Sequence, residues 1–153
     1  MTLHKGVTKM ENQSKILSSL QLQKMVFDKI EFNRTGFKNE NNPKFNIESN
    51  FMQSTDDHNL FKVELVMKCL KEDEYNFEIK LVGYFSFSSD GELDEGDKDI
   101  LISRNSVAIL MPYMRSQISL LTAQPEMDCI VLPPFNINEM IDGNNDSEDN
   151  TEN

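Results

Sequence analysis

The sequence has few of the residues that carry most enzymatic chemistry. It contains two histidines, His4 and His58, and two cysteines, Cys69 and Cys129. No CxxC, HExxH, GxSxG or Gly-rich phosphate motif is present, and two distant cysteines do not form a disulfide framework. We therefore predict that the protein is not an enzyme and has no catalytic residues, no metal and no cofactor. An enzyme with an unfamiliar site is the remaining alternative.

Long apolar segments are also missing. No run approaches the roughly 20 residues that a membrane-spanning helix needs. Residues 1–19 contain no uninterrupted apolar stretch before a small-residue cleavage site, as a signal peptide would. Cys69 lies in an apolar strand pattern, which favours a buried, reduced thiol. These features predict a cytoplasmic protein without membrane insertion.

Positive charge is scarce. The 15 Lys and Arg residues face 26 Asp and Glu residues, which gives a formal net charge of -11. A phosphate backbone would repel such a chain, so we expect no nucleic-acid partner. The acidity either serves solubility alone or attracts basic partners. Asp90, Glu92 and Asp94 have the spacing of a calcium loop, but Glu95 and Leu101 occupy the positions that require Gly and Glu. We therefore interpret this stretch as a solvated loop.

The apolar residues that are present predict one folded domain. Hydrophobic residues make up 38% of the 153 residues and include 9 Met and 10 Phe. Such a composition indicates either a plastic core or an adaptable binding surface. We predict a polar, mobile segment at residues 1–20, a folded domain at 21–141 and a disordered acidic tail at 142–153.

Alternating apolar and polar residues predict four strands, at residues 24–33, 44–55, 60–71 and 75–88. This alternation is typical of a sheet with one face exposed to water. A hairpin centred on Asp73 would place Met67 opposite Ile79 and Lys68 opposite Glu78. A shift of one residue would pair the apolar face of one strand with the polar face of the other. The pattern therefore predicts an odd-length loop around Asp73.

One strong helix is predicted at residues 105–123, capped by Asn105 or Ser106. Pro112 lies inside the pattern and should either kink the helix or mark its start. The helix carries two apolar stripes, which is more than one sheet contact requires. The sequence thus predicts an α+β fold, with a four-stranded antiparallel sheet and one long C-terminal helix. The extended segment that follows, with Pro133 and Pro134, is expected to act as a clamp or a groove wall.

Two segments resemble the SecB family of protein-export chaperones. They are residues 105–124, NSVAILMPYMRSQISLLTAQ, and residues 131–136, VLPPFN. Residues 29–32, KIEF, and 83–87, GYFSF, resemble two of the family's strands. The resemblance covers roughly residues 22–140. It implies a homotetramer, as a dimer of dimers, that acts as an ATP-independent holdase for unfolded or precursor polypeptides and delivers them to SecA.

The resemblance also suggests site residues. The client-binding candidates are Phe37, Phe45, Met114, Ile118, Leu132, Phe135, Ile137 and Met140, each with the core or a subunit interface as its alternative. Tyr113 and Leu120 are candidates for subunit contact. Glu78 matches one acidic position of the family's SecA-docking surface.

The sequence departs from the family pattern in two respects. The family's second C-terminal helix is shortened here, because an acidic stretch begins at Asp142. At the docking surface, Lys29 reverses the usual charge and Asn76 replaces an apolar residue. Besides a chaperone for export, the sequence therefore leaves open a dedicated chaperone of one partner, such as an antitoxin of a toxin–antitoxin system.

Overall fold

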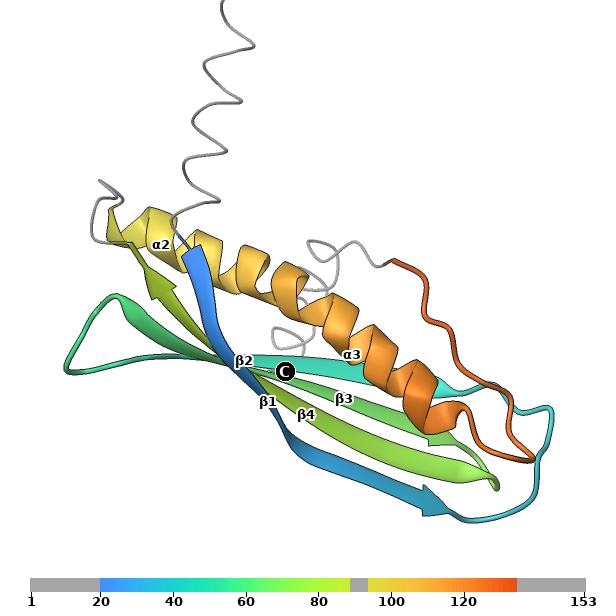
Figure 1. Ribbon diagram of the computed structural model, residues 1–153. Helices are drawn as coiled ribbons and strands as arrows, with labels where there is room; N and C mark the ends of the chain where they lie inside the picture. Colours follow the sequence, from blue (N-terminus) through green and yellow to red (C-terminus); the bar gives the residue numbers. More distant parts are fainter. Residues whose placement is uncertain (1–19, 89–93, 135–153) are drawn as a thin grey trace, which may run out of the picture.

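The computed structural model describes residues 20–88 and 94–134. Its four strands form one antiparallel sheet of order β1-β4-β3-β2. They are β1 (Leu20–Arg34), β2 (Lys44–Gln53), β3 (Leu60–Lys71) and β4 (Tyr75–Phe87). A continuous helical run crosses one face of the sheet (Figure 1), made of α2 (Glu95–Leu101), the π-helical turn η1 (Ile102–Ser106) and α3 (Val107–Thr122). The predicted α+β architecture is confirmed.

The β3–β4 hairpin has the predicted register. Met67 pairs with Ile79 and Lys68 pairs with Glu78, and the strands join through three residues around Asp73. Asp73 has a φ of 59°, a left-handed conformation that Asp adopts more readily than most residues. The apolar alternation along both strands fixed this register, because a slip would have exposed the whole core face.

β1 begins at Leu20, four residues before its predicted start and inside the segment predicted to be mobile. Its register against β4 shifts twice, between Leu22 and Lys24 and between Phe27 and Lys29. Each shift is a β-bulge, which inserts one extra residue and interrupts the alternation of side chains. The bulges at Gln23 and Asp28 therefore hid the first part of this strand from a period-two pattern.

The core lies between the helical run and the sheet. α3 packs on β3 and β4, where its buried residues include Leu110, Met114 and Ile118. Gly83 of β4 allows the close approach, because a Cβ at this position would lie 2.9 Å from Leu110 Cδ2. A larger residue would push the helix away from the sheet.

The helix begins about ten residues earlier than predicted. α2 occupies part of the stretch that we had predicted to be a loop, and residues 89–93 lie outside the described residues. Asp94 caps it by accepting a hydrogen bond from Asp97 N at 2.8 Å. The predicted cap Asn105 lies inside η1, and Ser106 makes no side-chain cap hydrogen bond. Pro112 lies within α3 and does not start it.

A buried ion pair fixes the connection between β1 and β2. Lys71 Nζ lies 2.9 Å from Glu74 Oε1, and both side chains are almost fully buried. Asn39 N donates to Glu74 Oε1 at 2.7 Å, and Lys71 Nζ donates to Asn39 O at 2.9 Å. Burial disfavours the charged form of Glu74, but hydrogen bonds from Lys71 and Asn39 outweigh it and hold its pKa below 4.5. The loop of residues 35–43 is thereby attached to the tip of the β3–β4 hairpin.

Candidate polypeptide-binding surface

The segment after α3 folds back alongside the helix (Figure 1). Thr122 Oγ1 accepts a hydrogen bond from Ile130 N at 2.9 Å, and Ser119 Oγ donates to Ile130 O at 2.8 Å. On the sheet side, an Arg34 guanidinium nitrogen donates to Glu126 O at 2.8 Å. Lys38 Nζ forms an ion pair with Asp128 at 2.9 Å. This segment therefore forms a wall beside α3, as predicted.

A groove of about 580 Å³ lies between α3 and this wall. We call it the α3 groove, and it is lined by Pro112, Arg115, Ser116, Ser119, Leu120, Val131 and Leu132. Leu120 is 71% exposed and Val131 is 79% exposed. Two large apolar side chains this exposed at one groove can bury area against an extended apolar segment of another chain. Arg115 adds a cation to the lining.

A second groove, of about 410 Å³, lies between the end of β2 and the start of the helical run. This β2 groove is lined by Phe51, Met52, Gln53, Phe61, Asp99, Ile100, Ile102 and Ser103. Ile100 is 57% exposed and sits next to the Asp99 carboxylate. β2 is an edge strand of the sheet, with β3 as its neighbour. An extended polypeptide could make apolar contacts in this groove.

The prediction of client binding is wrong for two residues, Met114 and Ile118. Met114 and Ile118 are both 0% exposed, because the face of α3 that carries them packs on the sheet. They are core residues and have no surface to offer a client. They belong to the apolar stripe formed by Leu110, Met114, Ile118 and Leu121. A stripe of this kind more often packs in the core than binds a partner.

The other candidates differ in position. Leu132 lines the α3 groove and is partly buried against the core. Phe45 lies on the helix side of β2 and is partly exposed, whereas Phe37 is 92% exposed in the loop that the Lys71–Glu74 pair holds. Phe135, Ile137 and Met140 lie outside the described residues.

The two residues predicted to make subunit contacts are exposed on α3. They are Tyr113 and Leu120, and the structure brings Leu120 into the same groove as Leu132. Sequence analysis did not single out Val131 or Ile100. Val131 belongs to the extended segment whose role as a wall was predicted. Ile100 lies between the predicted acidic loop and the predicted helix, and the signal for a helix there was the pair Asp94 and Asp97 at cap spacing.

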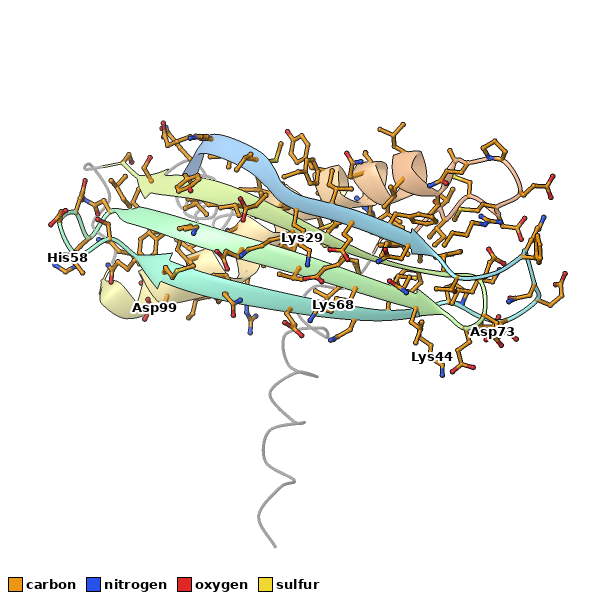
Figure 2. All side chains as sticks on the ribbon, turned by 90° about the horizontal axis from the view of Figure 1, so that it is seen from below. Lys29, Lys44, His58, Lys68, Asp73 and Asp99 are labelled. Atoms are coloured by element: carbon orange, nitrogen blue, oxygen red, sulfur yellow. The ribbon has the colours of Figure 1, made fainter. Side chains whose placement is uncertain are left out.

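The sheet face away from the helix, which we call the outer face, is a mosaic of charges (Figure 2). The strand registers place six lysines on it, namely Lys24, Lys29, Lys44, Lys62, Lys68 and Lys80. The same registers, and the ion pair of Asp28 with Lys80, place five carboxylates there, namely Asp28, Glu31, Glu48, Glu64 and Glu78.

Glu78, the candidate for SecA docking, is paired on this face with Lys29. The Nζ–Oε2 distance is 3.0 Å, and Glu31 lies 3.4 Å from the same ammonium. The hydrogen bond to Glu78 is the main cause that raises the pKa of Lys29. Lys68 is the residue opposite Glu78 in the register, but its ammonium reaches Glu48 instead, at 3.8 Å. Glu78 is therefore paired with Lys29, which shares its single positive charge with Glu31.

Other chemical groups have ordinary structural roles. Burial raises the pKa of the Cys69 thiol to about 12, so it stays protonated and unreactive. Among residues 20–88 and 94–134, no group of three His, Cys, Asp or Glu side chains could hold a metal ion. Within the same residues, no helix is long and apolar enough to cross a membrane.

No known family model matches the sequence, and no curated protein matches it. Among solved structures, a SecB-like chaperone of Mycobacterium tuberculosis, in complex with a ChAD peptide from the HigA1 antitoxin, is similar with a TM-score of 0.66 and 11% identity. The match covers 86% of this chain and 99% of that one. This chain has a SecB-like fold. The resemblance first recognised in the helix and the segment after it therefore extends to the architecture. A protein of unknown function from Streptococcus agalactiae is similar with a TM-score of 0.47 and 12% identity, over 75% of this chain and 97% of that one.

Proposed function

We propose that the protein is an ATP-independent chaperone that binds unfolded polypeptides, and not an enzyme. The observation that carries the proposal is the α3 groove on a SecB-like fold, with Leu120 and Val131 exposed to solvent. Burial of a client's apolar side chains would supply free energy at roughly 25 cal/mol per Å². The net charge of -11 would keep such an exposed apolar surface soluble.

Client contacts are assigned to both grooves on the helix side of the sheet. Leu120, Val131 and Leu132 form the first contact area, and Phe51 and Ile100 form the second. Phe45 on β2 and Phe37 in the adjoining loop extend the apolar surface along one margin of the sheet. Phe135, Ile137 and Met140, which follow the groove wall in sequence, stay in the proposal as further client contacts.

We further propose that the chain assembles as a homotetramer and works in the cytoplasm. α3 leaves Tyr113 exposed beside Pro112, on the side of the helix that faces away from the sheet. The resemblance to the SecB family implies that other subunits of the tetramer pack against this side of the helix. Such packing would cover Tyr113.

A dedicated chaperone of one partner is the second candidate, and the outer face favours it over delivery to SecA. Glu78 is paired with Lys29 at 3.0 Å, so this face does not present the unpaired acidic group that the family resemblance requires for docking. The M. tuberculosis structure contains an antitoxin peptide, and a single antitoxin-like client would need no docking to an export motor.

The test is suppression of aggregation in the absence of nucleotide. A denatured test protein is diluted into buffer with increasing amounts of the chaperone, and light scattering is followed. We expect suppression to be complete near stoichiometric ratios, because each client molecule must be covered. Suppression that requires ATP would contradict the proposal. A lack of suppression with several unrelated clients would leave the dedicated chaperone, which co-purification of one bound polypeptide from the native host would identify.

A further inference from the structure

The charge of the outer face differs from that of the rest of the protein. Among residues 20–88 and 94–134, it carries six of the 12 Lys and Arg residues but only five of the 17 Asp and Glu residues. The other six cations and 12 acids give the remainder of these residues a negative charge. An acidic partner would therefore be repelled by most of the protein and least by this face.

One end of the outer face contains an apolar hollow of about 360 Å³. Its walls come from the exposed side chains Met52, Leu60 and Tyr84, together with Gln23 and Lys62. The register explains this grouping, because Lys24, Tyr84, Lys62 and Met52 form one row across all four strands. The hollow opens on the side of the sheet opposite the α3 groove, so it is separate from the proposed client surface.

Lys24 lies next to Tyr84 at the β1 end of this row and carries a charge without an acidic partner among the described residues. Its ammonium lies 5.5 Å from the centre of the Tyr84 ring, which holds it beside the hollow. The other five lysines of this face each have a carboxylate within 4.0 Å, whereas Lys24 has none among residues 20–88 and 94–134. The bulge at Gln23 places Lys24 here, because it turns two consecutive side chains towards the outer face.

We propose that this hollow is a docking site for an acidic segment of a protein partner. One apolar side chain of the segment inserts between Met52, Leu60 and Tyr84. A carboxylate next to it pairs with Lys24. Such a segment fits because the hollow is apolar and the ammonium of Lys24 has no acidic partner among the described residues. The outer face is also the least acidic face of an acidic protein. Among the described residues, a basic segment would find no unpaired carboxylate beside the hollow. Glu64, two residues from Lys62 on β3, is already paired with Lys62 at 3.1 Å and with Lys80 at 3.3 Å.

The test measures how tightly a peptide binds the full-length protein. The peptide is labelled with fluorescein and has glutamates on both sides of one central phenylalanine. Fluorescence anisotropy measures its Kd for the wild type and for two variants, Lys24→Gln and Lys44→Gln. Both variants change the net charge equally, but Lys44 lies at the opposite end of the outer face, near Asp73 (Figure 2), and is paired with Glu72. We expect Lys24→Gln to weaken binding about fivefold, the upper end for an exposed ion pair. Lys44→Gln should change it less than about twofold.

Four further measurements decide the remaining outcomes. Replacing the peptide's phenylalanine by serine, or Leu60 by Ser, should weaken binding, because each removes one side of the apolar contact. An equal loss in the two lysine variants would overturn the proposal, since it would show a general charge effect. Equally tight binding of the matching lysine-rich peptide would also overturn it. If Lys24→Gln instead changes the mass measured by light scattering, the hollow binds a second copy of this chain and the proposal is wrong.

Discussion

The ammonium of Lys29 lies 3.0 Å from a carboxylate oxygen of Glu78, across the pairing of β1 with β4. The bulge at Asp28 brings Lys29 onto the outer face, where it pairs with the acidic position expected to dock SecA. The pair is exposed, so it contributes little to the free energy of unfolding. Its effect is on the local charge of the outer face. It is the main structural reason to expect poor delivery to SecA.

Binding to a SecA tail peptide should therefore be weak in the wild type and should improve when Lys29 is removed. Lys29→Glu removes one positive charge from the face and adds one negative charge, and we expect the affinity to rise at least about threefold at low salt and to fall as salt is added. Isothermal titration calorimetry measures both. Lys44→Glu on the same face is the control for net charge. Tight binding by the wild type that is lost in Glu78→Lys would show that the Lys29 pair does not block docking.

Gly83 is expected to tolerate no side chain. In Gly83→Ala the new Cβ would lie 2.9 Å from Leu110 Cδ2 and 2.7 Å from Phe85 Cε2, so both side chains must shift and the packing of α3 on β4 is disturbed. We expect a loss of about 1–3 kcal/mol in the free energy of unfolding, measured with urea. Gly96→Ala in α2 is the matched control, because its Cβ would meet only Asp94 Oδ1 at 3.5 Å. That change should be neutral or stabilise by about 0.5 kcal/mol. Equal effects at the two glycines would refute the packing argument.

The buried Glu74 should make the free energy of unfolding depend on pH. Its pKa is lowered in the folded state, so its contribution is present above pH 4.5 and is lost as the pH falls through the lowered value. Glu74→Gln leaves the buried Lys71 without a counter-charge and should cost about 3 kcal/mol at pH 7. The difference from the wild type should shrink below pH 4.5. Urea unfolding at several pH values measures this, with the exposed Glu72→Gln as control. A difference that does not change with pH would contradict the assignment.

The apolar side of α3 that faces away from the sheet predicts assembly. Multi-angle light scattering should give about four times the chain mass of 17.7 kDa. Tyr113→Glu should lower this mass, because it would place a charge in the proposed interface, whereas Tyr84→Glu on the outer face should leave it unchanged. A monomer at micromolar concentration would contradict the tetramer and would leave Tyr113 without the proposed subunit contact.

Periodic patterns predicted the central elements of this fold well. The core-facing positions of β3 from Phe61 to Cys69, and all those of β4, are apolar or glycine, so the register around Asp73 followed from the pattern. β1 was cut short because its two bulges break the alternation, and a bulge leaves no mark in hydrophobicity alone. The start of the helix was missed because α2 is acidic and contains Gly96, so its propensity is low. It forms as a continuation of the long helix behind the Asp94 cap.

The binding surface was harder to predict than the fold. Both stripes of α3 are apolar, and only the structure shows that Met114 and Ile118 are on the buried one. The groove depends on Thr122 and Ser119, whose hydroxyl groups hold the returning chain at Ile130. Hydrogen bonds between a helix and a distant extended segment have no periodic signature, so the sequence could suggest a wall but could not place it.

The central claim is that the α3 groove binds unfolded polypeptide. Its most direct test is the Kd of a fluorescently labelled, permanently unfolded client for three proteins, measured by anisotropy without nucleotide. They are the wild type, the double variant Leu120→Ser with Val131→Ser, and Leu70→Ser, which removes an apolar side chain that is 47% exposed on the outer face. We predict that the double variant binds at least about tenfold more weakly, as expected for the loss of two apolar contacts, while Leu70→Ser binds like the wild type. Equal affinities of all three proteins, with light scattering showing the same assembly, would contradict the account.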